Sequence, residues 1–212
     1  MRYKLIYFFG PDGTGKTTHA ELVSSYLKRK DVRALRATVK QHHTISYLLL
    51  KLFRPKDKDY LMLNYFGFDS ALKKRIRKPW KMLELFSLMP AVAYRVLLPS
   101  LMGFTVVCDR YVIDTLAVLS YFLDDRGLMF GYTARLLMRL IPKKALLIQL
   151  DADTGRILSR KQDEPLTEEL VNYYRSAYRS LVLAFDLPVT TVDTTNSSVE
   201  SIQKSILALI EA

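Results

Sequence analysis

The sequence has very little cysteine, and its one cysteine, Cys108, cannot form a disulfide within the chain. A chain of 212 residues with one thiol fits a reducing compartment, so we expect a cytoplasmic protein. Glycine and proline number only 8 each, which excludes collagen-like and proline-rich disordered chains. Because 50% of the residues are hydrophobic, the chain can build one domain with a substantial core.

Long apolar runs free of charge and proline are also missing. Only five apolar residues separate Lys4 from Gly10, too few for the hydrophobic part of a secretory signal. The most apolar long stretch, residues 83–103, is interrupted by Glu84, Pro90, Arg95 and Pro99. We therefore expect a core helix or a pair of helices there rather than a membrane span.

Acidic residues are scarce relative to basic ones, 21 against 32, which leaves a net charge of +11. This excess predicts anionic partners such as nucleotides, nucleic acid or a membrane surface. Basic residues gather between Lys51 and Lys81, where ten of them accompany three aspartates. A solvated basic face and an anion-binding surface are both compatible with that segment. Specific nucleic-acid binding is not expected.

Short β-forming runs alternate with segments of helical periodicity along the chain. The predicted strands lie at 4–9, 32–39, 104–110, 145–151 and 187–193. The predicted helices begin at Lys16 and lie at 43–53, 82–102, 112–122, 153–161, 166–185 and after Ser197, which stands in capping-box spacing to Glu200. Residues 54–80 are poorly periodic, with Pro55 and Pro79 at their margins. The alternation predicts a three-layer α/β/α sandwich with a parallel sheet of about five strands, in a single domain over 1–212.

The first predicted strand is followed by a glycine-rich turn that matches G-x-x-x-x-G-K-[ST]. Its residues are Gly10, Pro11, Asp12, Gly13, Thr14, Gly15, Lys16, Thr17 and Thr18. Such glycines let backbone N–H groups approach phosphate oxygens, and the helix N-terminus adds its positive dipole end. Lys16 can reach the β- and γ-phosphates, and the Thr17 hydroxyl can bind Mg²⁺. The turn, a P-loop, predicts binding of ATP or GTP.

Asp12 is unusual inside such a loop because a carboxylate repels phosphate. Its charge is favourable there if it meets a hydroxyl, a cation or hydrated Mg²⁺. A loop-capping aspartate is the alternative interpretation.

A second group of polar residues, Asp109 and Arg110, ends the predicted strand 104–110. Open parallel sheets bind their ligands at this carboxyl edge. Asp109 is placed to hold Mg²⁺ or one of its waters, and the planar guanidinium of Arg110 suits an acceptor phosphate. A structural Asp–Arg pair is the alternative.

A third group follows the predicted strand 145–151. Arg156 and Arg160 are four residues apart and therefore share one face of the predicted helix. Cations that close over the transferred phosphoryl group stabilise its transition state, so we predict a short catalytic lid over about 153–165. Solvated cations paired with neighbouring carboxylates are the alternative.

These motifs together resemble the thymidylate kinases, a branch of the nucleoside monophosphate kinase fold. The resemblance rests on "GPDGTGKTT", "VVCDRY" and "LLIQLDADTGRILSRK", which occur in the family's order. It implies that Lys16 and Thr17 serve ATP and Mg²⁺ and that Asp12 lies near the sugar hydroxyl of the acceptor. It also implies that Arg110 grips the acceptor phosphate and that Arg160 is the first lid arginine.

The same resemblance places further residues on the acceptor side: Asp109, Tyr111 and Thr115. Thr14 occupies the loop position where some members carry an arginine, so the catalytic cation is expected from the lid.

The acceptor pocket departs from the family pattern. The family's Arg-Glu-Pro-Gly is replaced by "ATVKQHH", and Ala117, Val118 and Leu119 replace its Ala-Tyr-Gln. The arginine that faces thymine in the family has no counterpart unless Arg95 reaches round. The segment "LSRKQDEPLTEE" also looks like a divergent thymidylate-kinase-like subgroup found with polysaccharide and surface-glycan genes.

We therefore expect a phosphotransferase of nucleotide biosynthesis that uses ATP and Mg²⁺, with dTMP as the leading acceptor. One alternative is a P-loop kinase for another nucleotide or for a sugar- or lipid-linked acceptor. Another is a nucleotide-dependent binding protein with slow ATPase activity that docks on an anionic membrane through residues 51–81. As in the resembling family, we expect a homodimer, formed through an exposed face of 82–102 or 112–122.

Overall fold

The structure is a computed structural model that describes residues 2–39, 70–162 and 166–212. Five strands form one parallel sheet in the order β2-β3-β1-β4-β5. They are β1 (Leu5–Phe9), β2 (Ala34–Thr38), β3 (Thr105–Asp109), β4 (Ala145–Asp151) and β5 (Val189–Asp193). Each lies within a run of the sequence that predicts a strand, so the predicted parallel sheet is confirmed.

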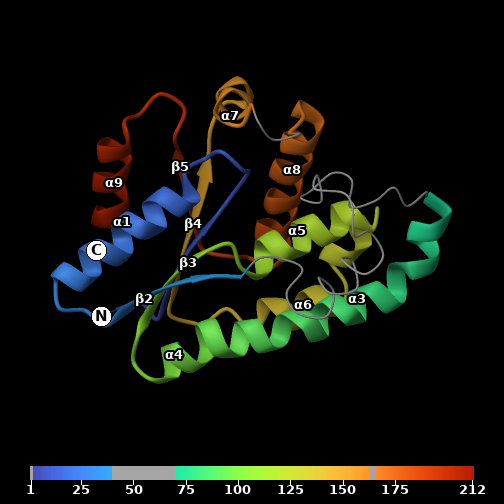
Figure 1. The fold of residues 1–212 in the computed structure, drawn as a ribbon, viewed down its shortest axis with the longest axis horizontal. Coiled ribbons are helices and arrows are strands. Elements are labelled where there is room, and N and C mark those ends of the chain that lie inside the picture. Colours follow the sequence, from blue (N-terminus) through green and yellow to red (C-terminus); the bar gives the residue numbers. More distant parts are fainter. Residues whose placement is uncertain (1, 40–69, 163–165) are drawn as a thin grey trace, which may run out of the picture.

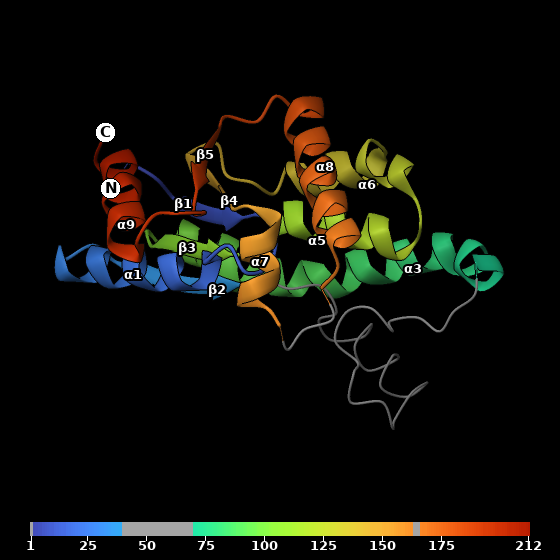
Figure 2. The same ribbon diagram turned by 90° about the horizontal axis from the view of Figure 1, so that it is seen from above.

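Helices cover both faces of this sheet (Figures 1 and 2). On one face lie α1 (Lys16–Arg29) and α9 (Val199–Glu211), and on the other lie α3 (Ser70–Val92), α5 (Val112–Phe122), α6 (Tyr132–Met138) and α8 (Glu168–Ala184). Alternate residues of β1 point to opposite faces of the sheet. Leu5, Tyr7 and Phe9 pack in one buried cluster, and Ile6 and Phe8 pack in the other. The three-layer α/β/α sandwich is thus confirmed.

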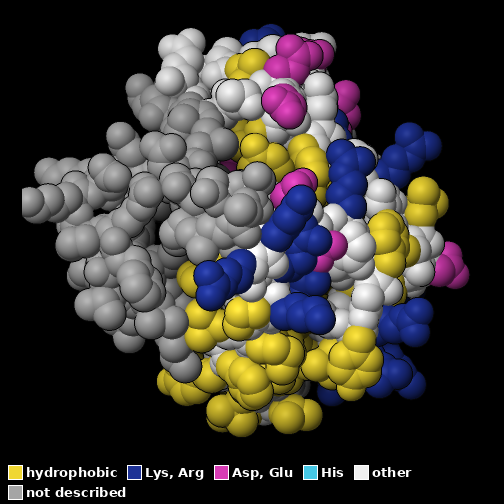
Figure 3. All heavy atoms as spheres, turned by 90° about the vertical axis from the view of Figure 1, so that its right-hand side faces the viewer, with side chains coloured by type: hydrophobic (Ala, Val, Ile, Leu, Met, Phe, Trp, Pro, Cys, Tyr) yellow, Lys and Arg dark blue, Asp and Glu magenta, His cyan; other side chains and the backbone are white. Residues whose placement is uncertain are grey.

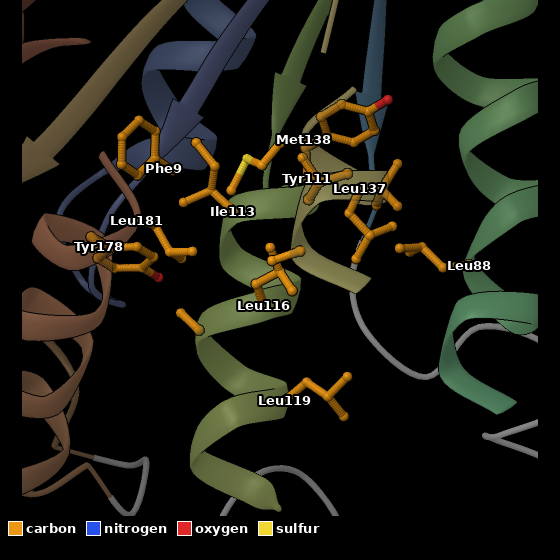
Figure 4. Close-up of a cluster of buried hydrophobic side chains, with 14 of the residues drawn as sticks. Phe9, Leu88, Tyr111, Ile113, Leu116, Leu119, Leu137, Met138, Tyr178 and Leu181 are labelled. Carbon is orange, nitrogen blue, oxygen red and sulfur yellow. The ribbon is translucent and has the colours of Figure 1, made fainter. Parts of the chain in front are cut away.

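The larger cluster is centred on α5. Figure 4 shows Ile113 and Leu116 of α5 between Tyr178 of α8 and Leu88 of α3. Because nearly all of α5 is buried in this way, it does not offer the exposed dimer face expected for 112–122. The expectation for 82–102 differs, because that helix leaves large apolar side chains exposed.

The helix α3 corrects the expected boundary at Pro79, which lies inside it. Tertiary contacts compensate for the N–H that proline lacks: Trp80 packs edge-on against Phe122 at 5.6 Å, and Lys81 pairs with Asp125. The helix continues through the π-turn η1 (Ala93–Leu97) into α4 (Leu98–Leu101). The predicted helix 43–53 and residues 51–69 of the basic segment lie outside the described residues.

Two short helices and one cap also differ from expectation. The 3₁₀ turn η2 (Arg126–Met129) and the helix α6 have no clear periodic signal in the sequence. The C-terminal helix is capped by Ser198, whose side chain accepts a hydrogen bond from the N–H of Ser201, rather than by Ser197. The helix predicted at 153–161 is confirmed as α7 (Thr154–Arg160), at the carboxyl end of the sheet, and its role as a lid stays a prediction.

Candidate functional site: a nucleotide pocket at the carboxyl edge of the sheet

The glycine-rich turn joins β1 to α1 and has the backbone that a phosphate cradle needs. Gly10 has φ +139°, and a Cβ there would collide with the carbonyl oxygen of Leu150 on β4. Gly15 precedes α1 with φ +88°, so the first N–H groups of the helix face the loop. The Thr14 hydroxyl closes the turn by donating to the Pro11 carbonyl at 2.8 Å.

Lys16 is folded into this loop. Its Nζ donates to the carbonyl oxygens of Gly10 and Pro11 at 2.7 Å each and lies 3.3 Å from Asp12 Oδ1. Burial lowers the pKa of Lys16, and the Asp12 charge opposes that shift. The loop therefore holds a buried cation whose counter-charge a phosphate could supply.

Arg110 meets Asp12 rather than its neighbour Asp109. Its guanidinium is paired with Asp12 Oδ1, so Asp12 lies between the charges of Lys16 and Arg110. Burial alone would raise the pKa of Asp12, but the two cations hold it well below its usual range. Asp12 therefore meets the cation expected beside it, and both Lys16 and Arg110 fill that role.

The backbone of Arg110 adopts a left-handed conformation, φ +66°, which is uncommon outside glycine. Two hydrogen bonds hold it there: Arg110 N–H donates to Phe8 O at 3.2 Å, and Val39 N–H donates to Arg110 O at 3.1 Å. Strain of this kind is concentrated at functional sites, where the surrounding fold enforces it. Here it turns the guanidinium toward the P-loop.

Asp109 ends β3 beside the start of α1. Thr17 Oγ1 donates to Asp109 Oδ2 at 2.7 Å, Thr38 donates to Oδ1, and Arg36 Nη2 lies 3.6 Å from Oδ2. A hydroxyl and a carboxylate side by side are hard oxygen ligands of the kind Mg²⁺ binds with phosphates and waters. The described residues hold no cluster of three or more His, Cys, Asp or Glu, so a site made wholly of protein ligands is not found among them. The Thr17–Asp109 pair fits Mg²⁺ carried by a nucleotide.

Lys16, Thr17 and Arg110 border one pocket of about 420 Å³, a volume typical of small-molecule sites. Asp109 is not among the residues that line it. Its walls are the P-loop, Arg110, Arg160 and Lys161, together with the turn and helix that follow β5, from Thr194 to Ile202. Arg160 is anchored at this wall, where it donates to Thr194 O at 2.9 Å and Gly13 O at 3.2 Å. Arg156, on the same helix, is exposed and is not among the residues that line the pocket.

The family model described as "Thymidylate kinase" matches residues 8–206. The chain belongs to the thymidylate kinase family. A solved structure of thymidylate kinase from Ehrlichia chaffeensis is similar at 15% identity, with a TM-score of 0.59 and 99% of both chains covered, a likeness that shows the fold. A comparison with curated protein sequences gave no match. The protein is therefore a nucleoside monophosphate kinase, and its family implies ATP as a substrate.

Two residues predicted on the acceptor side of this kinase are buried. Tyr111 is fully buried and its hydroxyl donates to Leu140 O, while Thr115 Oγ1 donates to Tyr111 O at 3.0 Å. Neither residue is among those that line the pocket. In this structure both support the turn that carries Arg110.

Asp114 is a functional candidate that the sequence reasoning missed. Its carboxylate accepts hydrogen bonds from Tyr7 Oη at 2.6 Å, Tyr178 Oη at 3.2 Å and Tyr111 N–H at 3.1 Å. Burial raises the pKa of Asp114, and Lys16 is the first of the groups that oppose the shift. Only its place three residues after Tyr111, at a helix start, is visible in the sequence. Its tyrosine partners lie 64 and 107 positions away.

Arg175, on α8, is a second residue whose role no nearby sequence pattern indicates. Its Nε lies 3.0 Å from both carboxylate oxygens of Asp151, and its Nη1 donates to Thr154 Oγ1 at 2.6 Å. A third donor, Nη2, is bound to Ala152 O. The planar guanidinium thus ties the end of β4 to the start of α7, the helix that carries the predicted lid arginines.

Proposed function

We propose that this kinase transfers the γ-phosphoryl group of ATP to the phosphate of dTMP in a Mg²⁺-dependent reaction. The observation that carries the proposal is the convergence of Lys16, the Thr17–Asp109 pair and Arg110 on one edge of the sheet. Bound Mg²⁺ would supply charge neutralisation on the phosphates, and Thr17 and Asp109 are the residues to hold it.

Positioning and charge supply most of the rate enhancement in phosphoryl transfer. Lys16 and the loop N–H groups bind the β- and γ-phosphates. Arg110 exchanges its Asp12 contact for the acceptor phosphate, which frees the Asp12 carboxylate to accept a hydroxyl. Arg160 borders the donor pocket, and Arg156 is the cation that closure of α7 would bring to the transferred group.

Arg95 supports a nucleotide acceptor. Its Nη1 donates to Thr38 O at 2.8 Å, at the carboxyl end of β2, where Thr38 also contacts Asp109. The side chain thus extends from the long helix to the edge of the sheet that holds Asp109. A role for Arg95 at the acceptor requires its side chain to extend this far.

A second candidate is a kinase for a different phosphorylated acceptor. Polar groups that read a base supply most of its discrimination, because an unpaired buried polar group is costly. Here Val39, just beyond β2, is fully buried, and Leu119 of α5 is also buried. Apolar side chains therefore stand where the family pattern is polar.

The test is an ADP-release assay with Mg-ATP against dTMP, dUMP, UMP, CMP, AMP, GMP and several sugar phosphates, with Lys16→Ala as the blank. Turnover concentrated on dTMP and abolished by EDTA supports the proposal. Turnover on another acceptor supports the second candidate, and slow hydrolysis without any acceptor contradicts both.

A cytoplasmic location stays a prediction, and so do two partners. A second copy of the chain is expected at residues 82–102, where large apolar side chains are exposed. Figure 3 shows hydrophobic side chains gathered along the lower edge of the molecule, the edge along which this helix runs in Figure 1. An anionic membrane surface is expected at the basic segment 51–81, of which the structure describes residues 70–81.

A further inference from the structure

Asp114, in the first turn of α5, is only 3% exposed although its side chain is a carboxylate. It caps the helix, because its Oδ2 accepts a hydrogen bond from Tyr111 N–H at 3.1 Å. The helices α8 and α9 are instead capped by exposed side chains, those of Thr167 and Ser198. Since burying a carboxylate is costly and capping does not require it, capping alone does not account for Asp114.

Two buried tyrosine hydroxyls meet the same carboxylate. Tyr7 Oη, from β1, donates to Asp114 Oδ2 at 2.6 Å and accepts from Asp114 N–H at 3.2 Å. Tyr178 Oη, from α8, lies 3.2 Å from Asp114 Oδ1, and Figure 4 shows Tyr178 facing the first turns of α5. The carboxylate therefore joins the sheet, α5 and α8 at one point.

Tyr178 also reaches the P-loop. Its hydroxyl lies 3.3 Å from Gly10 O, one of the two carbonyl oxygens that hold Lys16 Nζ. The hydroxyl has one proton, which it can donate either to this carbonyl or to Asp114. When Lys16 turns to a bound phosphate, the Tyr178 hydroxyl remains beside Gly10 O and can hold the first step of the loop in place.

On its other side, Asp114 holds the peptide unit that joins Arg110 to Tyr111. The N–H of this peptide donates to Asp114, and its carbonyl oxygen, Arg110 O, accepts from Val39 N–H at 3.1 Å. Because Arg110 has the left-handed φ of +66°, the orientation of its peptide has to be enforced by such contacts. Asp114 thus helps to set the direction in which the Arg110 guanidinium leaves the turn.

Three contacts of 3.1–3.3 Å consequently connect the turn of Arg110 with the P-loop, by way of Asp114 and Tyr178. Neither Asp114 nor Tyr178 is among the residues that line the nucleotide pocket. They therefore lie behind the groups that meet the phosphates. Phosphoryl transfer requires the donor and acceptor phosphates to be in line, and small errors in their placement cost much of the rate.

We propose that Asp114 is a positioning residue that, through Tyr178, holds Arg110 and the P-loop in the relative placement needed for phosphoryl transfer. The proposal rests on the roles proposed above for Lys16 and Arg110, but not on which acceptor is used. It implies that each substrate still binds when the connection is cut, whereas the alignment of the two is lost.

The experiment is steady-state kinetics of acceptor-dependent ADP release, with the acceptor that the wild type uses best. Tyr178→Phe removes only the hydroxyl that reaches Gly10 O, and Asp114→Ala removes the whole connection. Asp114→Asn is the conservative variant. The matched control is Tyr173→Phe, on the same helix, whose hydroxyl is hydrogen-bonded to Ser120 Oγ at 2.8 Å. Thermal unfolding of every variant identifies any that fails to fold.

We expect kcat to fall about tenfold in Tyr178→Phe and about a hundredfold in Asp114→Ala, with KM for both substrates within about threefold of the wild type. Asp114→Asn should keep kcat within about threefold, because its amide can donate to Tyr178, whose proton then goes to Gly10 O. Tyr173→Phe should behave like the wild type.

An unchanged kcat in folded Tyr178→Phe, or an equal loss in Tyr173→Phe, would overturn the proposal. So would a raised KM for ATP at unchanged kcat, because Tyr178 would then hold the donor loop alone. If Asp114→Asn lost as much turnover as Asp114→Ala, charge rather than positioning would be the role of Asp114. These outcomes leave the proposed function intact, which is contradicted instead if Lys16→Ala retains turnover.

Discussion

The P-loop site and the long helix α3–α4 place charged and apolar side chains in opposite ways. At the site, charged groups are buried, and each meets an opposite charge or a hydrogen bond: Asp12 lies between Lys16 and Arg110. Along α3–α4 the reverse holds, because apolar side chains such as Phe86 and Leu101 are exposed. The first region is satisfied within the monomer, whereas the second leaves apolar surface in contact with water.

The comparison also separates two kinds of binding. Phosphate at the P-loop replaces contacts that already exist, since Lys16 and Arg110 would exchange Asp12 and carbonyl oxygens for phosphate oxygens. A partner that covered the exposed side chains of α3–α4 would instead bind by removing apolar surface from water. The site therefore favours selective binding, whereas the exposed apolar face favours less selective contact.

The largest effect that would sharpen this comparison is loss of the P-loop cation. Lys16→Ala removes the group that reaches the transferred phosphate, so acceptor-dependent ADP release should fall by about a thousandfold. The variant should remain folded in thermal unfolding. Lys204→Ala, an exposed cation on α9, is the control and should keep full turnover. Unchanged turnover of Lys16→Ala would contradict the assignment of the site.

Asp12→Asn tests whether the buried charges of the site depend on one another. It leaves Lys16 and Arg110 without their counter-charge, so the free energy of unfolding should fall by about 3 kcal/mol. Mg-ATP should recover part of this loss, because its phosphates supply the missing charge. Urea denaturation with and without nucleotide measures both effects.

The direction in which the stability of the same variant changes with pH can also be predicted. The pKa of Asp12 is depressed in the folded state, so its contribution is present above about pH 4 and is lost as the pH falls. On acidification, the free energy of unfolding of Asp12→Asn should therefore fall less than that of the wild type. The exposed Asp186→Asn should behave like the wild type throughout. If Asp12→Asn and the wild type lost the same stability as the pH falls, the predicted contribution of the Asp12 carboxylate would be contradicted.

The two sides of the long helix can be compared directly with a pair of neighbouring substitutions. Leu88 is 2% exposed and Phe86 is 64% exposed. Leu88→Ala should lower the free energy of unfolding by about 3 kcal/mol through the cavity it leaves, and Phe86→Ala by less than about 0.5 kcal/mol. Chemical denaturation measures both. Equal losses would mean that Phe86 is buried in solution.

The smallest expected effect concerns the positioning of α7. Arg175→Lys keeps the charge but cannot reproduce the planar set of bonds to Asp151, Thr154 and Ala152, so stability should fall by about 1 kcal/mol. Amides at the start of α7 should exchange faster in hydrogen exchange. Arg179→Lys, one turn further along α8 and exposed, should change neither quantity. Unaltered exchange in Arg175→Lys would show that α7 is held by other contacts.

The sequence by itself determined the features that follow from local rules. The P-loop is recognisable because phosphate binding requires glycines at particular steps of a strand–turn–helix, and Asp109 and Arg110 are recognisable because they end a strand. Alternation of short strands with helices was enough for the parallel three-layer sandwich. These signals depend on backbone geometry within a few residues, which the order of residue types specifies.

Only the tertiary structure decided which groups meet. Asp12 pairs with a residue 98 positions away, Asp114 with two distant tyrosines, and Arg175 with the end of β4. Packing also carried α3 through Pro79 and buried Tyr111 and Thr115, both predicted at the acceptor. Periodicity marks residues 82–102 as apolar but does not say which side a sheet covers, because burial depends on what the rest of the chain places beside each face.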